Sequence, residues 1–234
     1  MITQIFSDSD FNTLPEKGVE AQKIRALLKA YGVGYDFCRF FRQNESAFLA
    51  VLDGNAALCC GAETDFAELS CFLLMHGISE LFCSETAADN LCRFGGFKRT
   101  DVNLMRFSGT GEPCEFEHAP SLSEVYEILC TGFALQFEPW YLDMSHRVRH
   151  GVTRFALREG ACLCVQHNMG GEALLSQVAT RTELRGKKRA TTLLKAVCAE
   201  LSPSEVFVIC EDSLLPFYEK AGFEFCERKA VLTR

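Results

Sequence analysis

Residues 178–223 constrain the fold of this chain more than any other segment. They run through a strand (VATRTEL), a basic turn (RGKKRA), an amphipathic helix, a second strand (VFVIC) and the run FYEKAGF. A helix start offers unpaired backbone N–H groups and a partial positive charge, so cations added there make it an anion site. The segment therefore predicts a phosphate-binding turn that joins a strand to a helix.

The turn concentrates positive charge in a chain whose formal net charge is -7. Its cations fall within nine residues: Arg181, Arg185, Lys187, Lys188 and Arg189. Small side chains at positions 186 and 190 would let a phosphate approach the backbone. The alternative interpretation is a solvated basic helix start without a ligand, because runs of charge generally face water.

The run FYEKAGF is the second informative motif. Pro216 suits the first turn of a short helix, Gly222 stands where a helix ends in a left-handed residue, and Phe223 opens the next strand. Tyr218 on this short helix has two interpretations. Alone it is an amphipathic core residue, and together with the basic turn it is a proton donor.

The composition is that of an ordinary globular protein. With 234 residues and 48% hydrophobic content, the chain suffices for one large domain or two smaller ones. The start MITQIFSDSDFN has neither a basic region nor a long apolar run, and no segment approaches ~18 consecutive apolar residues. We expect a cytoplasmic protein without a membrane segment. A pI near 5.3 argues against general nucleic-acid binding.

The 13 cysteines are an odd number with no CxxC pair, and many fall in apolar, strand-like runs. This pattern predicts reduced, buried thiols. Cys162, Cys164 and His167 are metal-ligand types, but strand alternation puts both cysteines on one apolar face and no fourth ligand follows at a suitable spacing. We expect core packing there and no metal site.

The stretch SGTGEPCEFEHAP lacks apolar periodicity and divides the chain into two halves. We predict a first domain at residues 1–112, a linker at 113–120 and a second domain at 121–234. Both halves show a helix, a hairpin, further strands and a short helix. The predicted elements include a helix at 19–31, hairpins about Asp53-Gly54 and Glu159-Gly160, and a strand at 172–180.

The two halves can be compared without gaps. Placing Gly96-Phe97 on Gly222-Phe223 gives an offset of 126, whereas the hairpin glycines Gly54 and Gly160 differ by 106. These offsets predict that the first half lacks 20 residues, the piece that holds the basic turn. The hypothesis is a duplicated fold in which only the second copy kept the anion site.

Together these motifs resemble those of the GNAT acyltransferase superfamily, which transfers an acyl group from coenzyme A to an amine. Its first signature is Gln or Arg, two residues, Gly, one residue, then Gly or Ala; Arg185 and Ala190 match it, and Lys188 replaces the central glycine. Its second resembles FYEKLGF, which Phe217 to Phe223 meet almost letter for letter. The resemblance covers roughly residues 121–234. It implies an α/β (α+β) fold of two GNAT-like units, the first degenerate, each a mixed, mostly antiparallel twisted sheet flanked by helices.

The resemblance also implies how acetyl-coenzyme A binds. The strand at Val178, Ala179 and Thr180 would splay from its neighbour and offer backbone groups to the pantetheine arm. The turn would hold the pyrophosphate through Arg185, Gly186, Lys187, Lys188, Arg189, Ala190 and Thr191. Tyr218 would donate a proton to the thiolate leaving group, whose conjugate acid has a pKa of ~8.5.

The implied reaction is direct attack of a neutral amine on the thioester, so a base must take the proton of the ammonium form. Glu172 and His167 are the local candidates, but both adjoin a Met-Gly-Gly turn where we expect solvated side chains, and neither is assigned.

The acceptor cleft would lie at the segment FEPWYLD, where Glu138, Trp140, Tyr141 and Asp143 offer aromatic walls and two carboxylates for an ammonium group. Packing between the halves is an equally good use for Trp140 and Tyr141. The run His146–His150 would recognise an acidic acceptor or form a solvated loop.

Two function classes follow. The first is a cytoplasmic N-acetyltransferase that acts on an amine of a small molecule or peptide. The second is a non-catalytic acyl-coenzyme A-binding or protein-interaction module, to which Lys188 and the altered first half point. The presence of Tyr218 favours the enzyme, because a pure binding protein needs no proton donor. A third interpretation, nucleic-acid contact by the basic turn, ranks last in an acidic chain.

Overall fold

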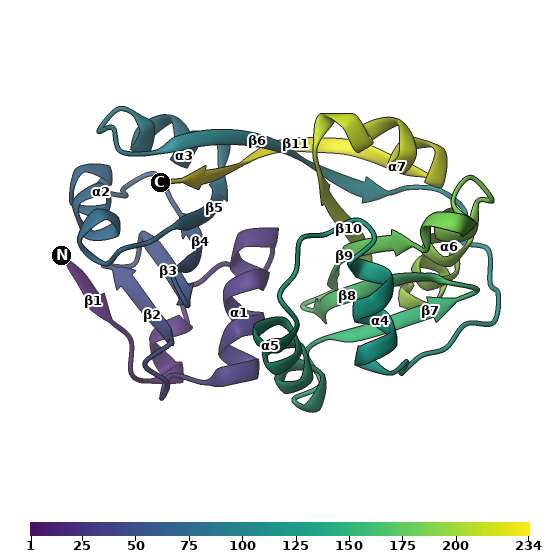
Figure 1. Cartoon of the computed structure of the whole chain (residues 1–234). Coiled ribbons are helices and arrows are strands. Elements are labelled where there is room, and N and C mark those ends of the chain that lie inside the picture. Colours follow the sequence, from purple (N-terminus) through teal and green to yellow (C-terminus); the bar gives the residue numbers. More distant parts are fainter. The chain divides into compact units, whose positions relative to one another are not determined.

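The computed structural model describes all 234 residues, Met1–Arg234. By its internal contacts the chain forms two compact units: unit 1 comprises Met1–Asn103 and Glu227–Arg234, and unit 2 comprises Leu104–Cys226. Strands β6 (Lys98–Phe107) and β11 (Phe223–Thr233) each contribute residues to both units (Figure 1). Unit 1 therefore needs the carboxyl-terminal residues. The predicted separation into domains at residues 113–120 stays a prediction.

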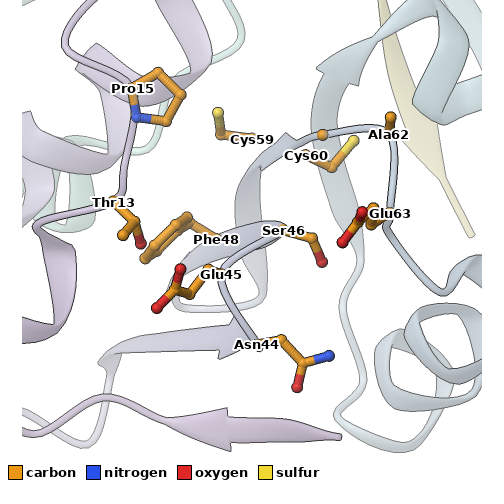
Figure 2. A pocket seen from close by; sticks show the side chains of 11 residues that line it. Thr13, Pro15, Asn44, Glu45, Ser46, Phe48, Cys59, Cys60, Ala62 and Glu63 are labelled. Carbon is orange, nitrogen blue, oxygen red and sulfur yellow. The ribbon is translucent and has the colours of Figure 1, made fainter.

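Unit 1 is a mixed, mostly antiparallel sheet with helices. Its strands follow the order β1-β2-β3-β4-β5-β11, and only β4 and β5 pair in parallel. Besides the two shared strands, its elements are β1 (Ile2–Gln4), α1 (Val19–Tyr31), β2 (Cys38–Gln43), β3 (Ala47–Leu52), β4 (Asn55–Cys60), α2 (Phe66–Met75), β5 (Glu80–Ser84) and α3 (Glu85–Cys92). The helix predicted at 19–31 and the hairpin at Asp53-Gly54 are confirmed. The turn between β2 and β3 lines a cavity, which Figure 2 shows.

Unit 2 repeats this arrangement. Its strands follow the order β6-β10-β9-β8-β7, with β9 and β10 parallel and the pairs β8–β9 and β7–β8 antiparallel. Besides the shared strands, its elements are α4 (Leu122–Leu129), α5 (Phe137–Arg149), β7 (Arg154–Arg158), β8 (Ala161–Met169), β9 (Glu172–Thr180), α6 (Arg189–Leu201), β10 (Glu205–Cys210) and α7 (Leu215–Ala221). The predicted hairpin at Glu159-Gly160 joins β7 to β8.

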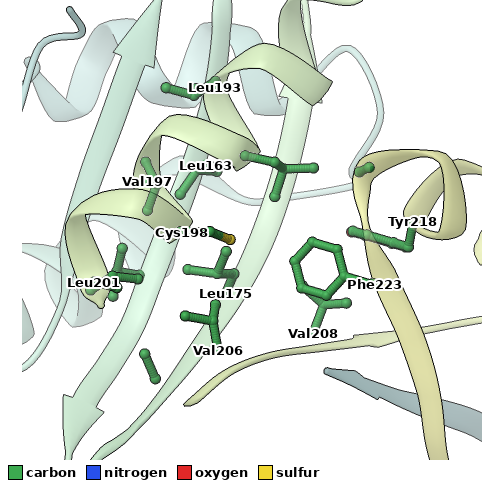
Figure 3. Packing of buried hydrophobic residues seen from close by; sticks show 14 of the residues in the cluster. Leu163, Leu175, Leu193, Val197, Cys198, Leu201, Val206, Val208, Tyr218 and Phe223 are labelled. Carbon is green, nitrogen blue, oxygen red and sulfur yellow. The ribbon is translucent and has the colours of Figure 1, made fainter. Parts of the chain in front are cut away.

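Alternation along β8 separates the two faces of the sheet in unit 2. Leu163 and Val165 belong to a core cluster with α6 and β10, which Figure 3 shows closely packed. Cys162 and Cys164 belong to the opposite cluster with α4 and α5. Both cysteines are at most 1% exposed, so the core position predicted for them is confirmed. All 13 cysteines of the chain are free thiols.

The sequence comparison of the halves paired the wrong hairpins. Gly54 lies between β3 and β4, whereas Gly160 lies between β7 and β8, which correspond to β2 and β3 by strand order. Unit 1 has both a strand, β4, and a helix, α2, where 20 residues were predicted to be absent. The predicted deletion is therefore wrong. The hairpins resemble one another because both are short turns with Gly at positive φ.

Two helices, α2 and α5, are not predicted by the sequence patterns. Residues 146–150, considered a solvated loop, lie at the end of α5, whose buried residues Trp140, Met144 and Arg147 have spacings of four and three. That spacing is the helical signal. The run FAELSCFLLM of α2 is apolar on nearly all sides, so it lacks this period. None of the helices has the length and apolar character that a membrane span requires.

A buried ion pair secures β11 within unit 1. Lys229 Nζ lies 2.6 Å from Glu20 Oε1, and the two side chains are only 5% and 10% exposed. Removing one partner of a buried pair leaves an uncompensated charge. We therefore expect Lys229→Met to lower the free energy of unfolding by about 3 kcal/mol in urea titrations, and Glu20→Gln combined with Lys229→Met to recover part of the loss. A loss below ~1 kcal/mol would contradict this role for the pair.

The same pair predicts a pH dependence. Burial opposes the charged form, but Glu20 and Glu227 outweigh it and raise the pKa of Lys229 above its ordinary value. A raised folded-state pKa gives stability that is fully present below the unfolded lysine value of ~10.4 and is lost as the pH rises through the folded value. Urea midpoints of the wild type and Lys229→Met should therefore converge only in strongly alkaline buffer.

Candidate active site

Strands β9 and β10 part halfway along their length. Their parallel pairing runs from Glu172–Glu205 to Leu175–Val208 and stops there, while β9 continues to Thr180 and β10 to Cys210. The predicted strand residues Val178, Ala179 and Thr180 lie beyond the part of β9 that pairs with β10, although Ala179 and Thr180 still pair with β8. Backbone groups of β9 that the β9–β10 ladder leaves unused can hydrogen-bond an extended ligand arm in this gap.

A bulge in β9 accompanies the parting of the strands. The register between β8 and β9 changes from Cys162–Ala179 to Cys164–Ser176, which places one extra residue on β9, and Gln177 has a φ of 49°. Such a bulge bends the strand. The Trp140 indole N–H on α5 donates to Gln177 Oε1 at 3.4 Å, so this buried tryptophan supports the bulge from the side of α5.

Three arginines of the basic turn are engaged within unit 2. Arg185 donates from Nη2 to the Thr131 carbonyl at 2.7 Å and from Nε to the Thr180 carbonyl at 3.2 Å. Arg189 donates to the carbonyl of Glu159 and lies 3.8 Å from its carboxylate. Arg181 lies within 3.6 to 3.9 Å of carboxylates on α4. These arginines bind the turn to its surroundings.

Lys187 and Lys188 are exposed, as is Arg185, but the guanidinium of Arg185 is held by Thr131 and Thr180. Lys188 is the N-cap of α6 in the left-handed conformation, at φ 57°, and no side chain caps the helix. The first α-helical hydrogen bond runs from the Thr192 N–H to the Lys188 carbonyl, which leaves the first-turn N–H groups of residues 189–191 without a helical partner. This helix start has the amides and charge that an anion requires.

The equivalent helix in unit 1 begins differently. Asp65 caps α2, and its carboxylate accepts hydrogen bonds from the N–H groups of Ala67 and Glu68, both at 3.0 Å. Its own negative charge thus occupies the amides that would hold a phosphate. The first unit lacks an open anion site because of this cap, and not because a segment is absent.

Tyr218 lies on α7, just after the end of β10. Tyr218 is 6% exposed, and its ring packs against those of Phe217 and Phe223, with centroid distances of 5.0 and 5.6 Å. Figure 3 shows Tyr218 and Phe223 in the core cluster of unit 2. Burial, with a smaller contribution from Cys210, raises the pKa of Tyr218 far above the ordinary tyrosine value. Its hydroxyl therefore keeps its proton at neutral pH, as a proton donor must.

The two candidate bases lie elsewhere. His167 and Glu172 are 1% and 6% exposed, so the expectation of solvated side chains is wrong. In the strand register, the backbone of Glu172 lies opposite that of Glu205 at the start of β10. This is about 16 Å along the strand from Cys210, the last residue of β10 before the segment that leads to Tyr218. His167 pairs with Leu174, near the same end of β9. A base beside Tyr218 must come from another element or from water.

The predicted acceptor residues divide into two groups. Trp140 is buried, and Asp143 accepts a hydrogen bond from Arg147 Nε at 2.6 Å. Glu138 and Tyr141 are exposed on α5, and the ring of Tyr141 lies 5.2 Å from that of Phe137. An aromatic surface with a carboxylate beside it is suited to a cation. The assignment of all four as acceptor residues stays a prediction.

Comparisons with known proteins find a match to a GNAT family model within this chain and similar GNAT folds among solved structures. Residues 156–231 match the family model described as acetyltransferase (GNAT) domain; this range covers much of unit 2 and extends into the part of β11 that belongs to unit 1. A solved tandem GNAT protein from the clavulanic acid biosynthesis pathway is similar over 100% of this chain and 98% of its own, at a TM-score of 0.60 and 13% identity. No curated protein sequence matches the chain.

Two further solved structures are similar. A GCN5-related N-acetyltransferase from Kribbella flavida covers 92% of this chain and 93% of its own, at a TM-score of 0.65 and 13% identity. Another from Sphaerobacter thermophilus covers 81% of this chain and 80% of its own, at a TM-score of 0.52 and 18% identity. At these low identities, the structural similarity shows a shared fold. The prediction of two GNAT-like units in one chain is confirmed.

The contacts of Arg185 predict that its forked guanidinium, which bridges two carbonyls, matters more for positioning the turn than its positive charge does. We expect Arg185→Lys and Arg185→Gln to weaken acetyl-coenzyme A binding alike, by roughly tenfold, because both lose the fork that joins Thr131 to Thr180. Calorimetric titration measures this. Thr131→Val, which removes only a hydroxyl, is the matched control with a smaller effect. Wild-type affinity in Arg185→Lys alone would show that charge suffices.

Proposed function

We propose that the chain is an N-acetyltransferase, which transfers an acetyl group from acetyl-coenzyme A to an amine of a small molecule or peptide by direct attack. The observation that carries the proposal is a single arrangement in unit 2. The pairing of β9 with β10 ends at Leu175–Val208, α6 starts at Lys188 without a side-chain cap, and Tyr218 lies on α7, the helix that follows β10 in the chain.

Each part of this arrangement has a task in the reaction. The first-turn amides of α6, with Lys187 and Lys188, bind the pyrophosphate of the cofactor. Backbone groups at Val178 and Ala179 align the pantetheine arm and stabilise charge on the thioester oxygen. Tyr218 supplies a proton to the departing sulfur. When bound, the cofactor supplies an activated acetyl thioester.

The amine enters from the side of α5. Glu138 and the exposed ring of Tyr141 attract its ammonium form, and a water-linked base removes the proton that blocks attack. Support for an acceptor on this side comes from the exposed aromatic surface of Phe137 and Tyr141. We propose a cationic amine as acceptor, because Glu138, next to Phe137 in the first turn of α5, is an exposed carboxylate.

The test has two stages. Calorimetry with acetyl-coenzyme A should give saturable binding at one site, and a panel of amines should then give release of free coenzyme A with at least one acceptor. Binding without turnover on any amine would support the alternative, a non-catalytic acyl-coenzyme A-binding module. Absence of binding would overturn both.

A further inference from the structure

Unit 1 contains a cavity of about 520 Å³, a volume that suits a small molecule. Its walls come from three places: the chain before α1 at Thr13 and Pro15, the turn between β2 and β3 at Glu45 and Ser46, and the segment from Cys59 to Glu63. Figure 2 shows these side chains around a common space. Nothing in the proposed acetyl transfer uses this cavity.

Strand register identifies the equivalent place in unit 2. Ala47 pairs with Cys60 at the end of the β3–β4 ladder, as Ala161 pairs with Thr180 at the end of the β8–β9 ladder. The next residue in each unit makes the same hydrogen bond: the Gly61 N–H donates to the Ser46 carbonyl at 2.7 Å, and the Arg181 N–H donates to the Gly160 carbonyl at 2.9 Å. Gly61 and Arg181 are therefore equivalent positions.

In unit 2 the side chain of Arg181 occupies this place. It passes over the turn between β7 and β8, where a Cβ built on Gly160 would lie 3.4 Å from Arg181 Cδ. Its guanidinium then reaches Glu127 and Glu124 at 3.6 and 3.9 Å. Gly61 has no side chain, so unit 1 is hollow where unit 2 holds an alkyl chain that ends in a guanidinium.

The charges around the cavity favour a guanidinium group there as well. Glu45 and Glu63 line it, and no lysine or arginine does. Glu45 lies in the turn between β2 and β3, as Glu159, which receives the guanidinium of Arg189 in unit 2, lies in the turn between β7 and β8. Burial raises the pKa of the Cys59 thiol to about 12, so this wall is uncharged. Arg25, whose charge acts on Cys59, donates to the carbonyls of Leu14 and Pro15.

We propose that the cavity of unit 1 binds an alkyl guanidinium compound, which takes the place that the Arg181 side chain takes in unit 2. The alkyl chain lies over the turn between β2 and β3, against Phe48, and the guanidinium is held by the carboxylates of Glu45 and Glu63. An anionic ligand is disfavoured by these carboxylates and by the Asp65 cap of α2.

Calorimetric titration of the full chain with n-butylguanidinium tests the proposal without acetyl-coenzyme A, so its failure leaves the proposed acetyl transfer untouched. We expect saturable one-site binding by the wild type. The neutral n-butylurea, equal in length, should bind at least tenfold more weakly. Equal affinity for both compounds, or no binding of n-butylguanidinium at millimolar concentration, would overturn the proposal.

Gly61→Arg fills the cavity with the side chain that unit 2 already has. A Cβ at this position meets only the Ser46 carbonyl at 3.5 Å, an ordinary contact, so the variant should fold. We expect it to weaken n-butylguanidinium binding more than tenfold, whereas the matched control Gly61→Ala stays within twofold. Unchanged affinity in Gly61→Arg, with an unchanged melting temperature, would place the ligand elsewhere and refute the proposal.

Glu45→Gln and Glu63→Gln test the charge directly. Each should weaken binding roughly threefold, since an exposed ion pair contributes ~0.2–1 kcal/mol. Aspartate substitutions at the same positions should retain most of the affinity. Wild-type affinity in the double glutamine variant would contradict the role of the two carboxylates.

Discussion

Tyr218→Phe should lower turnover by roughly 100-fold or more while the affinity for acetyl-coenzyme A stays within about twofold. The hydroxyl acts on the leaving sulfur, whereas the ring supports α7 by packing against Phe217 and Phe223. Phenylalanine keeps the ring and removes only the donor. Steady-state kinetics with the best amine of the panel, together with calorimetry, separate the two effects.

The pH profile adds a readout that a structural role would not change. Because burial raises the pKa of Tyr218, the wild type should show no loss of rate at the ordinary tyrosine pKa of ~10 that depends on this residue. Leu215→Ala, a change on the same helix that spares the hydroxyl, is the control for general loosening of α7. Turnover of Tyr218→Phe within threefold of the wild type would remove the tyrosine from the mechanism.

Reversing the charge of Lys187 and Lys188 should abolish most cofactor binding. We expect Lys187→Glu combined with Lys188→Glu to raise the Kd for acetyl-coenzyme A by roughly 100-fold, since hydrogen bonds to charged groups contribute ~1.5–3 kcal/mol each. The three arginines cannot compensate, because carbonyls and carboxylates of unit 2 already hold them. Titrations at low and high salt should show that the difference shrinks as ionic strength rises.

Lys188→Gly is the matched control for this pair. It removes one charge but keeps the left-handed backbone at φ 57°, which glycine adopts without strain. Its affinity should fall by only roughly tenfold, because Lys187 and the amides of α6 remain. If the double reversal bound acetyl-coenzyme A as tightly as the wild type, the ligand would not lie at this helix start.

Local pattern predicted several elements well. The left-handed Gly222 at the end of α7, the start of β11 at Phe223 and the hairpin at Glu159-Gly160 were predicted from their turn chemistry and are confirmed. Such features depend on a few adjacent residues. The correspondence between the two halves was harder to predict, because the hairpins at Gly54 and Gly160 look alike in sequence. The strand order in the sheet shows that the Gly160 hairpin corresponds to the turn between β2 and β3.

The basic turn also shows that a local sequence pattern does not reveal which distant residues its side chains contact. Sequence proximity grouped Arg185, Lys187, Lys188 and Arg189 as one cationic cluster. The folded chain places Thr131 and Glu159, 54 and 30 residues away in sequence, against the two arginines and leaves the lysines exposed. Similarly, only the fold showed that Trp140 meets Gln177 at the bulge of β9.

The amino-acid order by itself determined the motifs of unit 2, the reduced cysteine core and the class of fold, because helix caps, turns and strand alternation are local properties. Tertiary structure decided which cations stay available, where β9 and β10 part, and that Gly61 leaves a hollow where Arg181 fills one. Those outcomes depend on side chains from distant segments that share the same space, and no local pattern records which of them meet.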